Sequence, residues 1–359
     1  MSKNQQLTAR SVLGVLALLS VGAAVYTGKL NSSVAYNMVM GVFWFIVVMS
    51  VLVIIHEFAH FLVGKKLGAE PEVFSVGMGS VLYKFNWLGA EFRISALPIG
   101  GYVKFKKVQF DGENGADGVN EKINPSAWIW IALAGPVSNL VVSFVVFATM
   151  SFIALDSLKV VDLGSNVYNL QMDCAKNNQV CSGVAGLVQR MLLRQKGVDS
   201  IVFDLNTYSV VSNPEVSAQS TTNEIVDNKP LTSVVMSYHL HKFFVKMTFN
   251  SLVGLFTNIT KNYTHMSGPI GIANQLQVTA KMGVEYLWMM FGAISFSLGF
   301  MNLLPLSVLD GGRVLLAVYQ TTVKANINIR FLNVVNGVSV LGLLILMLIG
   351  VFADLGRLL

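Results

Sequence analysis

Charged residues are scarce in this chain of 359 residues, because Asp, Glu, Lys and Arg together make up only 12% of it. An average soluble domain contains about 25% charged residues. Hydrophobic residues make up 53% of the sequence. The two observations together exclude an ordinary soluble domain and indicate a membrane protein.

The chain also lacks a run of basic residues and an internal repeat. Its formal net charge is +6, but no stretch of Lys and Arg concentrates this charge, so we expect no nucleic-acid partner. Many transporters are built from two related halves with broken helices. The absence of such a repeat argues against a transporter.

Five apolar runs are long enough to span a membrane, at residues 11–28, 38–64, 127–155, 283–305 and 333–352. A hydrocarbon core of about 30 Å takes about 20 helical residues. The first run follows Lys3 and Arg10 and ends in small residues, so it is either a retained helix, which we favour, or a cleaved signal peptide. The orientation of the second run is the same in both cases.

Basic residues beside these runs predict the orientation of the chain, because Lys and Arg accumulate on the cytoplasmic side of a membrane. The loops after the second and fourth runs carry such residues and should be cytoplasmic: Lys65, Lys66, Lys104, Lys106, Lys107, Lys324 and Arg330. The segment 156–242 is then outside. It holds Cys174 and Cys181, which either form a disulfide in this oxidising compartment or remain free thiols.

The predicted fold is a polytopic α-helical membrane protein with four core transmembrane helices and, if the first run is retained, an additional amino-terminal one. Small non-membrane parts join them: a cytoplasmic or re-entrant β-sheet and a mixed extracytoplasmic domain. We divide the chain into an amino-terminal hydrophobic segment (1–35), a first membrane half (36–155), the extracytoplasmic domain (156–245), an extracytoplasmic amphipathic helix and loop (246–282), and a second membrane half (283–359).

The predicted sheet lies within residues 71–107, where the pattern changes from helical to strand-like. Apolar stretches at 73–76, 81–85 and 91–94 are separated by turns that contain glycine. The following stretch, 98–105, is apolar but broken by two adjacent glycines. It is either a segment that re-enters the membrane, where protein or water must satisfy its amides, or an ordinary amphipathic hairpin.

His56, Glu57 and His60 form an H-E-x-x-H pattern inside the second apolar run. Side chains at positions i and i+4 share one face of a helix, so both imidazoles can reach one metal ion while Glu57 acts on its water. A chance match is less plausible than in a soluble helix, because charged groups are costly to insert into a span. The pattern predicts a zinc site about 13 Å inside the cytoplasmic end at Lys65.

A catalytic zinc needs three protein ligands and one open position for water. The remaining histidines, His239, His241 and His265, fall on the opposite side of the membrane, and we expect them to be surface residues. An Asp before two glycines is often only a turn residue. Asp310 nevertheless follows the fourth run on the cytoplasmic side, at a depth similar to the histidine pair, which favours it as the third ligand.

These residues resemble the site-2 protease family of intramembrane zinc metalloproteases, whose signatures match His56-Glu57-x-x-His60 and Leu309-Asp310-Gly311. Further segments resemble its bacterial regulator of sigma-E protease branch, in the family's order across both membrane halves. They are residues 74–79, 98–104, 134–139, 267–273 and 302–312.

The resemblance implies a role for each matching residue. His56, His60 and Asp310 would bind Zn2+, and Glu57 would be the catalytic base. The substrate would contact the end of the fourth run and the re-entrant strand, at Asn302, Gly100, Gly101, Tyr102 and Val103. The structural motifs would include Gly135, Pro136, Asn139 and Pro305.

The family acts on single-pass transmembrane proteins in the lipid bilayer, after another protease has removed most of the outer domain. Examples are anti-sigma factors of stress responses and remnant signal peptides. The resemblance also implies a place in the bacterial inner membrane, with the active site toward the cytoplasm. Because a helix hides its peptide bonds, the substrate must unwind, and an exposed strand edge would pair with the freed backbone.

Three features depart from the family pattern. No carboxylate-binding loop of a PDZ domain is recognisable within 156–242, so a PDZ domain is either degenerate or absent there, and regulation with or without a partner in its place stays open. Ser307 stands where the branch usually has a second proline, and Arg313 where it often has a histidine. The extra amino-terminal run is the third departure.

Two alternatives stay open: an intramembrane metal transporter or channel, and a relative that binds membrane segments without cutting them.

Overall fold

The computed structural model describes residues 32–107, 123–154, 158–162, 167–172, 201–204, 209–211, 229–257, 267–323 and 329–358. The chain divides into two compact units: unit 1 contains residues 1–138, 263–278 and 302–359, and unit 2 contains residues 139–262 and 279–301. The first apolar run, both cysteines and His265 lie outside the described residues.

Four helices of the described chain are long and apolar enough to cross a membrane: α2 (Ser32–Lys66), α3 (Pro125–Ala154), α9 (Val284–Asn302) and α11 (Ile329–Leu358). They confirm the second to fifth apolar runs as helices and the chain as a polytopic helical protein. α9 ends earlier than the apolar run, at Asn302, because a turn begins there and Pro305 has no amide hydrogen with which to continue a helix.

A small antiparallel sheet in unit 1 consists of β1 (Pro71–Trp87) and β2 (Ala90–Phe105), as the strand-like pattern predicts. Both strands bend back on themselves at glycines. Gly77, Gly79 and Gly100 have φ angles of 84°, 90° and 79°, which side chains rarely permit.

The bends turn the two strands into four extended segments that lie side by side. Ser75 in β1 pairs with both Arg93 and Tyr102 of β2, so the first part of β1 lies between two parts of β2. The last part of β2, residues 100–105, therefore forms one edge of the sheet. One of its sides has no strand beside it among the described residues of unit 1.

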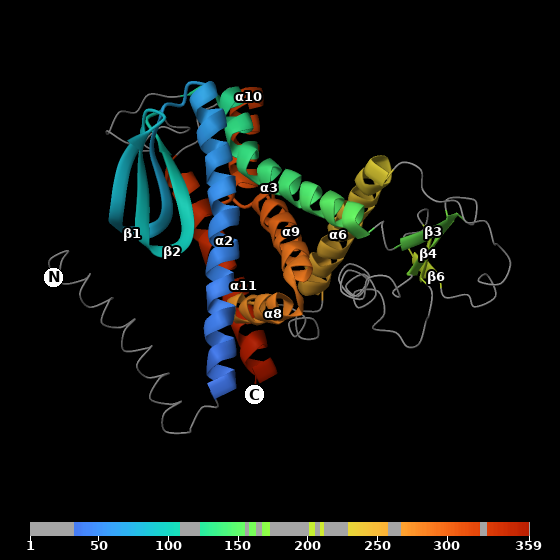
Figure 1. The fold of residues 1–359 in the computed structure, drawn as a ribbon. Helices are drawn as coiled ribbons and strands as arrows, with labels where there is room; N and C mark the ends of the chain where they lie inside the picture. Colours follow the sequence, from blue (N-terminus) through green and yellow to red (C-terminus); the bar gives the residue numbers. More distant parts are fainter. Residues whose placement is uncertain are drawn as a thin grey trace. The chain divides into compact units, whose positions relative to one another are not determined.

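Aromatic packing holds the sheet beside the half of α2 that ends at Lys66 (Figure 1). The ring of Phe61 on α2 is fully buried, and its centroid lies 5.9 Å from that of Phe74 and 5.4 Å from that of Phe92. Burial of each such ring stabilises the fold by roughly 1.5–3 kcal/mol. The packing fixes the sheet against the part of α2 that carries the H-E-x-x-H pattern.

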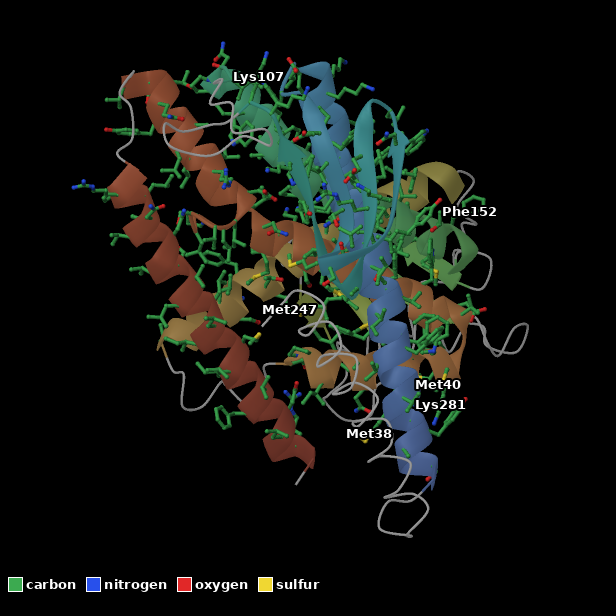
Figure 2. All side chains as sticks on the ribbon, turned by 90° about the vertical axis from the view of Figure 1, so that its left-hand side faces the viewer. Met38, Met40, Lys107, Phe152, Met247 and Lys281 are labelled. Carbon is green, nitrogen blue, oxygen red and sulfur yellow. The ribbon has the colours of Figure 1, made fainter. Side chains whose placement is uncertain are left out.

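The sheet covers only part of the length of α2. Figure 2 shows Lys107, which follows β2, at one end of unit 1 and Met38 and Met40 toward the other end. The sheet therefore lies beside the end of α2 that carries Lys65 and Lys66.

A buried carboxylate connects α11 to α8 (Pro269–Met282) in unit 1. The side chain of Asp354 is 1% exposed and accepts hydrogen bonds from the backbone N–H groups of Gly268 at 3.1 Å and Gly271 at 2.8 Å. The first amides of a helix have no partner within it, and a negative charge complements the helix dipole there. Asp354 therefore anchors the amino-terminal end of α8 to the last span.

Unit 2 contains α6 (Lys229–Thr257), most of α9 and the later part of α3, together with a four-stranded antiparallel sheet. The strands of this sheet are β3 (Leu158–Asp162), β4 (Val167–Met172), β5 (Ile201–Asp204) and β6 (Ser209–Val211). The helix expected within 246–282 begins earlier, at Lys229, and a second one, α8, follows it.

His241 on α6 is half-buried among aromatic rings, so the prediction of a surface residue was wrong. Its ring centroid lies 5.3 Å from those of Phe144 and Phe147 and 5.6 Å from that of Phe296. Its Nδ1 lies 2.9 Å from the Ser237 carbonyl oxygen, and burial lowers the pKa of its imidazole. With Phe244, these α6 residues follow the i, i+4, i+7 spacing of a buried helix face.

Candidate metal centre

The two histidines of the H-E-x-x-H pattern lie on one face of α2. His56 and His60 are 7% and 8% exposed, and their ring centroids are 4.8 Å apart. Asp310 is the first residue of α10 (Asp310–Val323). Within the described residues, these three side chains form the one group of His, Cys, Asp or Glu whose ligand atoms could share a metal ion.

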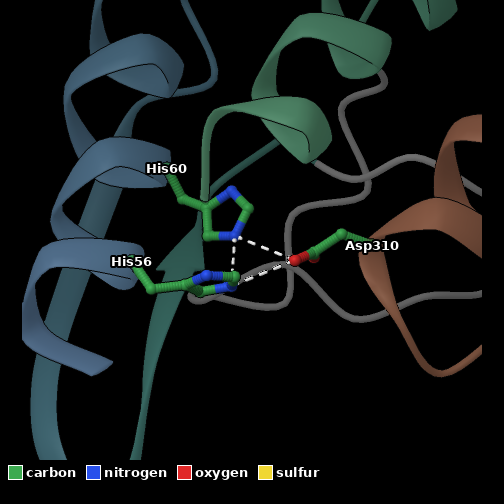
Figure 3. Close-up of side chains that lie close together, drawn as sticks. All are labelled: His56, His60 and Asp310. Carbon is green, nitrogen blue, oxygen red and sulfur yellow. Dashed lines mark hydrogen bonds and ion pairs between the residues drawn. The ribbon is translucent and has the colours of Figure 1, made fainter. Parts of the chain in front are cut away.

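The three ligand atoms form a small triangle (Figure 3). His56 Nε2 lies 3.0 Å from Asp310 Oδ2, His60 Nε2 lies 3.4 Å from the same oxygen, and the two Nε2 atoms are 3.2 Å apart. A tetrahedral zinc with bonds of about 2.0–2.1 Å keeps its ligand atoms about 3.3 Å apart. The triangle therefore has the size that a tetrahedral zinc requires.

The hydrogen bond behind His60 favours the tautomer that binds a metal. His60 Nδ1 lies 2.7 Å from the backbone carbonyl oxygen of Ile131, which can only accept a hydrogen bond. In a neutral ring the proton is then on Nδ1, and the lone pair of Nε2 faces His56 and Asp310. This lone pair, the Nε2 atom of His56 and the Asp310 carboxylate converge on one point and fit a cation.

A tight turn delivers Asp310 to the histidines. The turn over residues 303–309 is closed by hydrogen bonds from Leu306 N to Leu304 O and from Leu309 N to Leu306 O, both 2.8 Å. A Cβ at Gly311 would collide with the Leu303 carbonyl, and one at Gly312 with the Leu306 carbonyl. The two glycines after Asp310 therefore let the turn pack directly onto the start of α10.

Glu57 faces the edge segment of the sheet. The backbone amide of Val103 hydrogen-bonds the Glu57 carboxylate. A Cβ at Gly101 would lie 3.2 Å from Glu57 Cγ and 2.8 Å from the Ser75 carbonyl oxygen, so only glycine allows this approach. On the same segment, the Tyr102 side chain hydrogen-bonds Arg93. The sheet edge thus lies beside Glu57, next to the three ligand atoms.

The other residues of the expected site occupy different places. Asn302 is the half-buried last residue of α9, and Pro305 is an exposed residue of the turn before Asp310. Pro136 is buried inside α3. Asn139 is fully buried in unit 2, where its backbone carbonyl accepts a hydrogen bond from the Ser295 hydroxyl at 2.8 Å.

Gly135 on α3 lies directly against both imidazoles, a contact that its sequence motif did not predict. A Cβ at this position would collide with Nε2 of His60 and Nε2 of His56. Replacement of Gly135 by alanine is therefore expected to displace both rings and to weaken zinc binding about 10- to 100-fold. Competition with a zinc chelator measures this change.

Gly337→Ala on α11 is the matched control, because a Cβ added at Gly337 meets nothing within 4 Å. This variant should bind zinc like the parent. Equal zinc affinity in the Gly135 and Gly337 variants would contradict the placement of Gly135.

Comparisons with known proteins agree over most of the chain. The family model described as Peptidase family M50 matches residues 44–347. Three bacterial relatives carry the name "putative zinc metalloprotease". The one from Campylobacter jejuni is 24% identical and covers 97% of this chain and 99% of its own length. The one from Helicobacter pylori is 26% identical, with 88% and 99% covered, and the one from Mesorhizobium japonicum is 25% identical, with 80% and 91% covered.

Proposed function

The chain belongs to peptidase family M50, and we propose that it hydrolyses peptide bonds within the transmembrane segments of single-pass membrane proteins. It is a zinc metallopeptidase and a multi-pass membrane protein. The observation that carries the proposal is the triangle of ligand atoms from His56, His60 and Asp310. Two of these residues, His56 and His60, lie within the candidate span α2, so the zinc site belongs to the part of the chain that can cross a membrane.

His56, His60 and Asp310 are the residues that hold the zinc in this proposal. A bound zinc supplies a Lewis acid and lowers the pKa of water to near 7. Glu57 accepts the proton of the attacking water at its carboxylate and later donates it to the nitrogen of the leaving amine. The Val103 amide, which hydrogen-bonds this carboxylate, keeps Glu57 oriented toward the water.

The edge segment 100–105 holds the substrate. A transmembrane helix must unwind before it can be cut, and its freed backbone groups then need partners in a place with little water. The segment is an edge of the sheet, so its backbone can add the substrate as a further strand. Because Gly101 lies beside Glu57, a strand added there passes close to the catalytic base, and Asn302 contributes a polar contact.

The site opens toward the cytoplasmic side of a bacterial inner membrane, since α2 ends in Lys65 and Lys66 close to the histidine pair. Residues 156–245 then form the small extracytoplasmic domain, with a regulatory partner in place of PDZ domains. Substrates of this kind are anti-sigma factors of stress responses and remnant signal peptides.

Reconstitution of the purified full-length protein into liposomes with a single-pass reporter tests the proposal. Cleavage within the reporter's span is expected, and a zinc chelator should reduce it by at least about 100-fold because the lowered water pKa is lost. Added zinc should restore it.

The same liposomes separate the protease from a metal transporter. Zinc-dependent entry of metal into the vesicles without cleavage of the reporter would overturn the proposal. Binding of the reporter without any cut fragment, at full zinc loading, would favour a non-catalytic relative.

A further inference from the structure

A pair of serine hydroxyls connects the turn before Asp310 to the last span. The Oγ atoms of Ser307, in the turn, and Ser339, on α11, are 3.0 Å apart. Both residues are 7% exposed. Neither serine belongs to the H-E-x-x-H or L-D-G pattern, and both lie in unit 1 with the three proposed ligands.

The backbone contacts of the turn join it to itself and to the start of α10. Its backbone hydrogen bonds join Leu306 to Leu304 and Leu309 to Leu306, all within the turn, and Gly311 packs against its carbonyls. Among the side-chain hydrogen bonds of residues 303–309, the Ser307–Ser339 pair is the one that reaches another helix. Ser307 precedes Asp310 by three positions.

Ser339 and His56 lie equally far from the basic ends of their helices. Ser339 follows the basic start of α11 at Arg330 by nine residues, and His56 precedes the basic end of α2 at Lys65 by nine residues. Each is about 13 Å along its helix from that end. A hydroxyl at this depth has little water to bond with, so the partner that it finds in the protein persists.

The residue type at 307 gives a reason for the pair. A proline ring at this position would fix φ by itself. Serine leaves φ free, so the turn requires another constraint to hold Asp310 in one place. A hydrogen bond to a rigid helix provides it.

We propose that Ser307 and Ser339 are positioning residues that hold Asp310 against His56 and His60 and thereby raise the affinity of the site for zinc. The inference rests on the proposed zinc ligands. It adds a hydrogen bond to α11 that holds the turn before the third ligand, Asp310.

Zinc affinity of the full-length protein, measured by chelator competition, tests the inference with Ser307→Ala, Ser339→Ala and the double variant. Each single change should weaken zinc binding about three- to tenfold. The double change should weaken it no further, because all three variants remove the same hydrogen bond. At limiting zinc kcat should fall with KM unchanged, since the sheet edge that holds the substrate is intact.

Ser297→Ala is the matched control, because the Ser297 hydroxyl bonds only the Ala293 carbonyl of its own helix, at 2.9 Å. It should keep parental zinc affinity. A purely structural role of the pair would lower the unfolding temperature of the zinc-free protein and leave zinc affinity intact. That result, or additive losses in the double variant, would overturn the inference.

Asp310→Ala in the same series separates the two possible failures. If it keeps zinc, the proposed ligand set is wrong. If it loses zinc while both serine variants bind like the parent, the ligand set stands and the inference about the serine pair fails.

Discussion

Glu57→Gln is expected to reduce cleavage of a transmembrane reporter by about a thousandfold while zinc remains bound. Glutamine keeps the shape of the side chain and an oxygen that can accept the Val103 amide hydrogen bond. It cannot accept and return a proton, and general acid–base catalysis contributes about 10²- to 10⁴-fold. Single-turnover cleavage and the zinc content of the same sample measure the two effects separately.

Glu91→Gln on β2 is the control for this experiment. Glu91 pairs with Lys84 at 3.1 Å and with Arg93, and these ion pairs hold the pKa of its carboxyl below the usual range. It makes no contact with Glu57 among those described, so cleavage should stay close to that of the parent. Undiminished cleavage in Glu57→Gln would remove Glu57 from the mechanism, and loss of zinc would instead place it among the ligands.

The parts of the fold that the sequence predicts are those that depend on local pattern. Long apolar runs give the four candidate spans, since hydropathy alone determines which segments can cross a membrane. The strand-like stretches give β1 and β2, and the i, i+4 spacing puts His56 and His60 on one face of α2.

Asp310 is a partner that local pattern alone does not identify. It lies 254 residues from His56, and its selection depended on a shared depth in the membrane and on a family resemblance. The structure brings its carboxylate to within 3.4 Å of both Nε2 atoms. The roles of the three side chains as zinc ligands stay predictions, which metal analysis of the variants tests.

Contacts made by backbone atoms, and close approaches that depend on a glycine having no side chain, could not be predicted from the sequence. The Ile131 carbonyl that orients His60 has no signal in the sequence, because every residue carries such a group. Gly135 was expected to have a structural role only, since a motif does not show what faces the missing Cβ. Asp354 and the Ser307–Ser339 pair depend in the same way on which helices are neighbours.

The error at His241 has a different cause. The topology put α6 outside the membrane, and histidine is usually partly exposed, so a surface position followed. The spacing of Ser237, His241 and Phe244 already marks one helix face, and the rings of Phe147 and Phe296 cover it. The periodicity of α6 was a better guide to burial than the residue type.

Asp310→Ala is expected to lower the zinc content of the purified protein from one ion per chain to less than about a tenth of an ion. Without Asp310, two imidazoles remain, which is one fewer than the three protein ligands that a catalytic zinc needs. Asp354→Asn is the matched control, because Asp354 is a buried carboxylate of the same unit that contacts Gly268 and Gly271 instead of the histidines. It should keep its zinc even if it unfolds at a lower temperature.

Metal analysis of folded parent and Asp310→Ala protein, purified side by side, is the most direct measurement of whether α2 and the start of α10 hold one ion together. One zinc per chain in the parent and almost none in the variant is the predicted result. Equal zinc in both proteins, or a folded and active parent without zinc, would contradict the site as we assign it.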